Sequence, residues 1–133
     1  MRKINELFFL IIVFVLSACA TKVNFPISTI VPAADISAKI EKKSNNYIVD
    51  ILATSLASPE RLSPPSNFYV VWVVTDAGSV RNLGQLTTNR NGSNTLKTIV
   101  PYAFNQIIIT SEVESDVQFP SSREITRINV RLK

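Results

Sequence analysis

Apolar and polar residues alternate with a period of two along most of this chain. Ile36, Ala38 and Ile40, for example, are each followed by a polar residue. This period predicts half-buried strands, because the apolar residues of a helix recur about every 3.6 positions. The strands are expected at 36–40, 47–56, 68–75, 80–88, 95–100, 106–114 and 125–132. About seven strands spaced by turns, with no stretch of helical period, predict an all-β, antiparallel sandwich or barrel.

Two connections and one strand favour the sandwich. Residues 57–67 carry three of the seven prolines, which excludes them from a sheet interior and suits a crossing between two sheets. Residues 68–75 (FYVVWVVT) have the composition of a central strand that is buried on both faces. Asn91-Gly92 predicts a tight hairpin turn. We therefore expect an immunoglobulin-like β-sandwich, with Trp72 in its core.

The first residues have the pattern of a secretory signal. Arg2 and Lys3 precede ten consecutive apolar residues at 7–16, which are too few for a permanent membrane helix of about 20 residues. Leu16-Ser17-Ala18-Cys19 follows, and this tetrapeptide resembles the lipobox of bacterial lipoproteins. The resemblance implies cleavage between Ala18 and Cys19 and acylation of Cys19, which would attach the protein to a membrane. An ordinary signal peptide or a short anchor helix is the alternative.

The lipobox resemblance also divides the chain and gives it a location. It implies a signal peptide at 1–18, with the mature chain starting at the lipidated Cys19. Residues 19–34 contain Pro26 and Pro32 and no clear period, so they are interpreted as a tether, with a short edge strand around 23–30 as an open alternative. Residues 35–133 form the sandwich. Ala20 follows the cysteine where some inner-membrane lipoproteins of enteric bacteria have Asp, which favours the periplasmic side of the outer membrane.

Composition excludes several kinds of chemistry. The chain has no histidine, one cysteine and three glycines. It therefore cannot form a Ser-His-Asp or Cys-His catalytic system, a His/Cys zinc site, an internal disulfide or a glycine-rich phosphate loop. The mature chain has 12 basic and nine acidic side chains, too small and scattered a surplus for a nucleic-acid-binding protein. Catalysis by a carboxylate pair or a Ser-Lys dyad stays possible but no pair is marked, so we expect neither an enzyme nor a bound cofactor.

Three groups of side chains have both a structural and a functional interpretation. Tyr69 and Trp72 should lie on opposite faces of one strand, and an exposed Tyr69 could stack on a sugar or a peptide. Glu112, Glu114 and Asp116 could bind calcium, but strand residues two apart lie about 7 Å from each other and cannot enclose an ion alone. We instead expect cross-strand ion pairs, with Glu114 near Arg123 and Glu112 near Ile125 or Arg127.

The last strand has an alternating pattern of its own. Ile128, Val130 and Leu132 alternate with Arg127, Asn129, Arg131 and Lys133. The pattern favours a half-buried edge strand whose positive charges resist aggregation. A basic stripe for lipid headgroups or for an acidic partner is the alternative.

Residues 68–120 contain Tyr69-x-x-Trp72, Leu83-Gly84, the run Ile109-Thr110-Ser111-Glu112, and Pro120. In these features the stretch resembles the extracytoplasmic domain of anti-sigma-K-type factors. The resemblance implies a β-sandwich on an envelope anchor that binds or senses something. The sigma-binding segment and membrane helix that precede the domain in that family are replaced here by a lipobox, so sigma inhibition is not expected.

Together, these patterns predict a lipid-anchored envelope lipoprotein whose sandwich is a non-catalytic binding or sensing module. The ligand is not indicated, and the loops at 57–67 and 115–122 are the candidate binding surfaces. A structural subunit of an envelope complex, docking through an edge strand, is the main alternative. An enzyme that uses carboxylates or a serine is a third.

Overall fold

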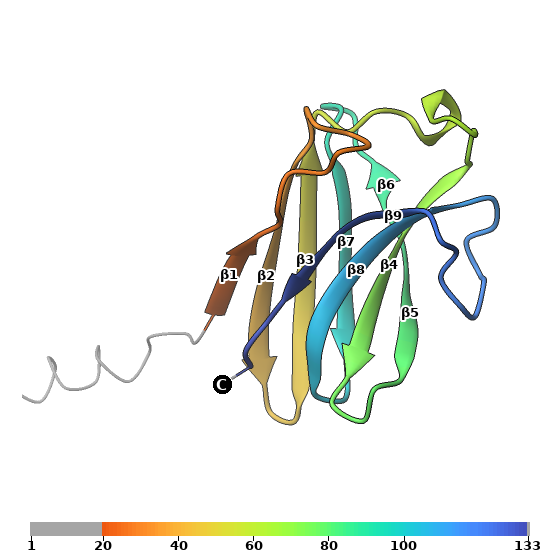
Figure 1. Ribbon diagram of the computed structural model, residues 1–133. Helices are drawn as coiled ribbons and strands as arrows, with labels where there is room; N and C mark the ends of the chain where they lie inside the picture. The colour runs from red at the N-terminus through yellow and green to blue at the C-terminus, as the bar shows by residue number, and fades with distance from the viewer. Residues whose placement is uncertain (1–19, 133) are drawn as a thin grey trace, which may run out of the picture.

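The computed structural model describes residues 20–132, and these residues form two antiparallel sheets packed face to face (Figure 1). Such a pair of sheets is a β-sandwich, so the predicted fold class is confirmed. The first sheet has the order β1-β2-β3-β7-β6: Ala20–Asn24, Asp35–Lys43, Asn46–Thr54, Asn94–Val100 and Thr87–Thr88. The second has the order β5-β4-β8-β9: Val80–Gln85, Phe68–Thr75, Phe104–Glu112 and Glu124–Asn129.

The strand order is that of an immunoglobulin-like domain. Strands β2, β3 and β7 face β5, β4, β8 and β9, and the chain changes sheet between β3 and β4, between β5 and β6, and between β7 and β8. Residues 20–132 contain nine strands where about seven were expected. The two extra strands, β1 and β6, are short and lie at the two edges of the first sheet.

Of the two connections singled out in the sequence, the proline-rich loop joins the two sheets, and the Asn91-Gly92 hairpin joins neighbouring strands of the first sheet. The proline-rich loop leads from β3 to β4 as predicted and contains the 3₁₀ turn Pro59–Arg61. Residues 80–88, expected to be one strand, divide at the buried Leu86, after which β6 pairs with β7. The Asn91-Gly92 hairpin is confirmed, with Gly92 N–H donating to Asn89 O at 3.0 Å and Gly92 at a φ of +85°. Glycine adopts that φ without the steric cost of a Cβ.

Residues 20–34 are part of the folded domain. β1 pairs with β2 along its whole length, from Ala20 opposite Glu41 to Asn24 opposite Ser37. Phe25 and Val31 then enter the core at 8% and 4% exposure. The tether interpretation is therefore replaced by an edge strand at 20–24, earlier than the alternative considered at 23–30, and a packed loop. The two prolines lie in that loop and leave the strand uninterrupted.

The strand β4 is buried on both faces, as its composition predicts. Residues 69–73 are all at most 4% exposed, and β4 lies between β5 and β8 in its sheet. Tyr69, Val71 and Val73 point into the main core between the sheets, whereas Val70 and Trp72 belong to a second cluster on the outer face. The expectation that Trp72 lies in the sandwich core is therefore wrong. Tyr69 occupies the core instead, because side chains three apart on a strand point to opposite sides.

Candidate functional site

The outer face of the second sheet is covered by residues 113–123, the connection between β8 and β9, which we call the covering segment (Figure 1). Its Val117 packs against the cluster formed by Val70, Trp72 and Ile108. Trp72 is fully buried, although no second sheet covers this face. The burial of an indole by a loop lacking regular structure requires the loop to be held in place by further contacts.

A chain of hydrogen bonds beneath the covering segment supplies part of that attachment. The indole Nε1–H of Trp72 donates to Thr110 Oγ1 at 2.8 Å, and the Thr110 hydroxyl donates to Glu112 Oε2 at 2.6 Å. The same carboxylate oxygen accepts a hydrogen bond from the backbone N–H of Ser121 at 2.9 Å. Glu112 is 5% exposed, so its buried carboxylate joins the covering segment to the end of β8. Buried polar groups with satisfied hydrogen bonds of this kind define one arrangement of a loop.

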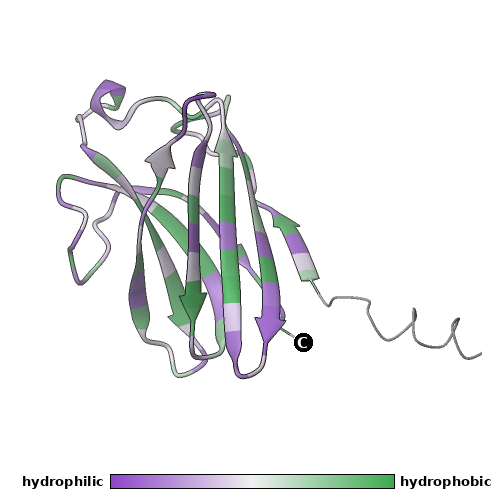
Figure 2. Cartoon of the chain, turned by 180° about the vertical axis from the view of Figure 1, so that it is seen from behind, coloured by the Kyte–Doolittle hydropathy of each residue, from purple (hydrophilic) through white to green (hydrophobic). Residues whose placement is uncertain are grey.

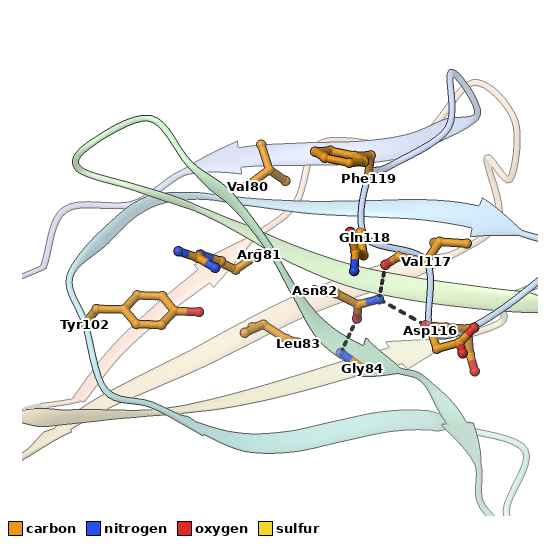
Figure 3. Close-up of a pocket in the computed structure, with 11 residues that line it drawn as sticks. Val80, Arg81, Asn82, Leu83, Gly84, Tyr102, Asp116, Val117, Gln118 and Phe119 are labelled. Atoms are coloured by element: carbon orange, nitrogen blue, oxygen red, sulfur yellow. Dashed lines mark hydrogen bonds between the residues drawn. The ribbon is translucent and has the colours of Figure 1, made fainter.

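A second attachment comes from the edge strand β5. The side-chain amide of Asn82 donates to Ser115 O at 3.0 Å and to Val117 O at 2.9 Å. Its carbonyl oxygen accepts from the backbone N–H of Gly84 at 2.8 Å (Figure 3). Gly84 has a φ of +126° and lies at a bulge in β5. Val71 of β4 pairs with Gly84 and Trp72 pairs with Asn82, so Leu83 is the extra residue of the bulge. The bulge thus turns the β5 backbone so that one asparagine side chain can join strand and segment.

A groove of about 830 Å³ lies between β5 and the covering segment. Figure 3 shows Arg81 and Tyr102 on one side of Asn82 and Asp116 on the other, with Gln118 between Asn82 and Phe119. Phe119 stands at the rim with 78% of its surface exposed, which is unusual for an aromatic side chain. The groove therefore combines aromatic surfaces, amide groups and charges of both signs, the set of groups used for noncovalent recognition. Asp116 is the one acidic side chain in its lining, so the groove offers no carboxylate pair.

The three carboxylates that the sequence singled out do not form a row. Glu112 is buried in the network described above, whereas Glu114 and Asp116 are exposed on the covering segment. The expected pairs of Glu114 with Arg123 and of Glu112 with Arg127 are wrong. The chain leaves β8 at Glu112, and the ladder places Thr110 opposite Glu124 with an irregularity at residues 109 and 110. Between residues 20 and 132, no group of three or more carboxylates or other candidate ligands is arranged to hold a metal.

The two arginines have other partners. Arg123 donates from its guanidinium to the backbone oxygens of Pro64 and Pro65, which joins the covering segment to the proline-rich loop. Arg127 pairs with Glu124 on its own strand, and the hydrogen bond from this carboxylate raises the pKa of the guanidinium. Both interactions are exposed, so they add little to the free energy of unfolding.

The last strand has the predicted edge pattern. β9 lies at the edge of its sheet, and Arg127, Asn129 and Arg131 are exposed. Val130 is buried and Ile128 is half-buried, as the alternation predicts. A half-buried edge strand with a polar outer face is thus what the structure contains.

Tyr69 cannot present an aromatic surface to a ligand. It is 4% exposed, and its hydroxyl donates to Ala57 O at 2.7 Å. Burial raises the pKa of Tyr69 to about 12, with a smaller contribution from the negative charge of Glu60. Its role is to fix the proline-rich loop to β4. Among residues 20–132 the exposed aromatic side chain is Phe119 instead. The sequence marks it only as an apolar residue inside a polar loop.

The outer face of the first sheet carries charged side chains together with the exposed apolar residues Leu52 and Ile99. Its centre is a shallow charged cluster of Lys39, Glu41, Asp50 and Lys97 around Ile48. Lys39 and Glu41 form a salt bridge of 3.0 Å, and the hydrogen bond from Lys39 lowers the pKa of Glu41. Such a face is typical of a sheet with one solvated side.

The lipidation prediction falls on residues that the structure does not describe. Ala18 and Cys19 both lie outside the described residues 20–132. Within that range, no helix is long and apolar enough to cross a bilayer. Comparisons of the chain with protein-family models, with curated proteins and with solved structures give no match. The lipobox and anti-sigma-type resemblances stay predictions that rest on the residues quoted for them.

Proposed function

We propose that the protein is a lipid-anchored lipoprotein of the bacterial envelope whose sandwich is a non-catalytic binding module. Cys19 carries the acyl chains, and the groove between β5 and the covering segment is the binding surface. The location proposed is the periplasmic side of the outer membrane. The observation that carries the binding proposal is the groove itself, with Arg81, Tyr102 and Phe119 free to contact a ligand.

The construction of the groove supports recognition better than catalysis. Its wall is held by Asn82 and by the Glu112 network, so its shape is set before a ligand arrives. A preformed surface loses less conformational entropy on binding than a flexible one. One of the two candidate loops from the sequence, 115–122, contributes residues 115–119 to this lining. The other, 57–67, lies outside it.

The alternative of a structural subunit that docks through an edge strand has one specific observation in its favour. Five successive residues of β5, 80–84, line the groove, and β5 is an edge strand of its sheet. An extended peptide lying in the groove could therefore pair with the free backbone edge of β5. Under this alternative the groove is an assembly interface and its occupant is a stoichiometric protein partner.

Photo-cross-linking in living cells tests the binding surface. A diazirine amino acid is introduced at Gln118 in the groove, and a matched control carries it at the exposed Thr88 on the opposite sheet. The expected result is one adduct of defined mass at position 118 that is absent at position 88. Equal adducts at both positions, or none at either, would contradict the proposal. A protein adduct that co-purifies stoichiometrically would favour the edge-docking alternative.

The anchor is tested separately by Cys19→Ala. We expect the wild-type chain to incorporate an alkyne-labelled palmitate and to remain in the membrane fraction, and the variant to lose both. A variant that is processed and retained like the wild type would overturn the lipoprotein proposal. Because Cys19 lies outside the described domain, the variant should keep the sandwich intact, and circular dichroism provides that control.

A further inference from the structure

The register of β1 fixes where an anchor at Cys19 would sit on the domain. Ala20 pairs with Glu41, two residues before the end of β2, and β1 runs antiparallel to β2. The chain that precedes Ala20 therefore joins the domain at the end that carries the β2–β3 hairpin. One residue spans at most about 3.6 Å, so an acylated Cys19 would hold this end directly at the bilayer surface.

Several other connections lie at the same end, which we call the anchor end. It comprises the β2–β3 hairpin at 42–46, the β4–β5 turn at 76–79, the β7–β8 connection at 101–103 and the last residues, 130–132 (Figure 1). The place of the last residues follows from Val130, whose N–H donates to Asn105 O at the start of β8.

The charges of the two ends of the sandwich differ. The described residues of the anchor end hold exposed Lys42, Lys43 and Arg131 against the exposed acid Asp76, and the half-buried Glu41 beside the hairpin is balanced by its salt bridge to Lys39. Figure 2 shows the hydrophilic end of β2 next to the start of β1. The opposite end comprises Asp35, the loops 25–34, 55–67 and 89–93, and the covering segment, which leaves β8 there. It has no basic surplus, since its charged residues are Asp35, Glu60, Glu114 and Asp116 against Arg61, Arg90 and Arg123. The basic surplus is thus confined to the end nearest Cys19.

We propose that the anchor end rests on the membrane, with Lys42 and Lys43 against anionic lipid headgroups. This inference depends on the proposed acylation of Cys19 and adds an orientation to it. A lysine is attracted to an anionic leaflet within about one Debye length, roughly 8 Å at physiological salt. Lys42 and Lys43 directly follow Glu41, the strand partner of Ala20, so they lie next to the point where the anchor joins the domain. The long axis of the sandwich then stands upright, and the β5 groove opens sideways along the membrane.

The test uses the full acylated chain in vesicles and two single-cysteine variants. Asn45→Cys lies in the hairpin turn of the anchor end, and Ala57→Cys lies in an exposed loop of the opposite end. A maleimide fluorophore labels each new thiol, since the sulfur of an acylated Cys19 is blocked. Quenching by lipids with a quencher at the headgroup is then measured in vesicles of phosphatidylethanolamine and phosphatidylglycerol.

We expect strong quenching at Asn45→Cys and little at Ala57→Cys. Adding Lys42→Glu and Lys43→Glu, or omitting phosphatidylglycerol, should bring the first value towards the second. The matched control Arg61→Glu with Arg90→Glu should change neither. Equal quenching at both sites, or insensitivity to the lysine variants, would overturn the orientation. Labelling of the wild-type chain at Cys19 would instead overturn the anchor, so the two failures are distinguishable.

Discussion

Replacing Thr110 by valine removes one hydroxyl from the buried hydrogen-bond chain beneath the covering segment while keeping the shape of the side chain. Two contacts are lost together. The indole N–H of Trp72 loses its acceptor at 2.8 Å, and the carboxylate of Glu112 loses a donor at 2.6 Å. Valine has no polar atom to replace either contact.

The expected cost follows from these two losses. An unsatisfied buried donor costs about 1–3 kcal/mol, and a hydrogen bond to a charged group contributes about 1.5–3 kcal/mol. The extra buried methyl group returns somewhat less than 1 kcal/mol. Thr110→Val should therefore lower the free energy of unfolding by about 3 kcal/mol. For a domain of this size that corresponds to a decrease in Tm of roughly 10 °C.

A double-mutant cycle with Trp72→Phe separates the network from simple loss of packing. Phenylalanine has no N–H, so in that background Thr110→Val leaves no orphaned indole, and its cost should be smaller by about 1–2 kcal/mol. The measurement is urea unfolding of the four proteins followed by far-UV circular dichroism. Costs that add within about 0.5 kcal/mol would refute the reasoning, because uncoupled residues behave additively.

Three further substitutions probe the attachments of the loops. Asn82→Ala removes the hydrogen bonds to Ser115 O and Val117 O, so it should expose residues 113–123 to limited proteolysis while digestion elsewhere stays unchanged. Protection equal to that of the wild type would contradict the attachment of the covering segment by Asn82. Burial raises the pKa of Tyr69 from 10.0 to about 12, so the contribution of this group to the free energy of unfolding is present below pH 10 and is lost as the pH rises to 12. Tyr69→Phe should remove this pH dependence, as measured by urea unfolding at a series of pH values between 9 and 12, and an equal loss in both proteins would contradict it. Gly84→Ala should cost about 1–3 kcal/mol because of its φ of +126°, and since Leu96 is at an ordinary contact distance, adding Leu96→Ala should not restore stability in calorimetry.

The β-sandwich fold could be predicted from the sequence, because period-two alternation and turn residues are local signals. The buried strand at 68–75, the sheet-crossing proline loop and the Asn91-Gly92 hairpin all follow from residues close together in the chain. The division at Leu86 was not visible, because a strand that changes sheet keeps its alternation across the change.

The candidate site depends on contacts that no local pattern encodes. Both faces of β4 are apolar, so the side to which Trp72 points could not be decided from its composition. The roles of Glu112 and Asn82 depend on where the covering segment folds back, tens of residues away from Asn82 in the sequence. A carboxylate at the end of an alternating strand is predicted to be exposed, and its burial follows only from the position of the segment that covers it.

The topology of the two sheets has a consequence for how the domain acquires its structure. The central ladders join distant parts of the chain: Tyr47 pairs with Val100 in one sheet, and Phe68 pairs with Glu112 in the other. Closing such long loops costs entropy before any contact forms, so sandwiches of this kind fold in milliseconds to seconds, well behind helical bundles of equal length. A chain that leaves the cytoplasm unfolded would therefore spend that interval with unpaired strand edges exposed. Folding of this domain should accordingly be sensitive to the chaperones of the compartment in which it takes place.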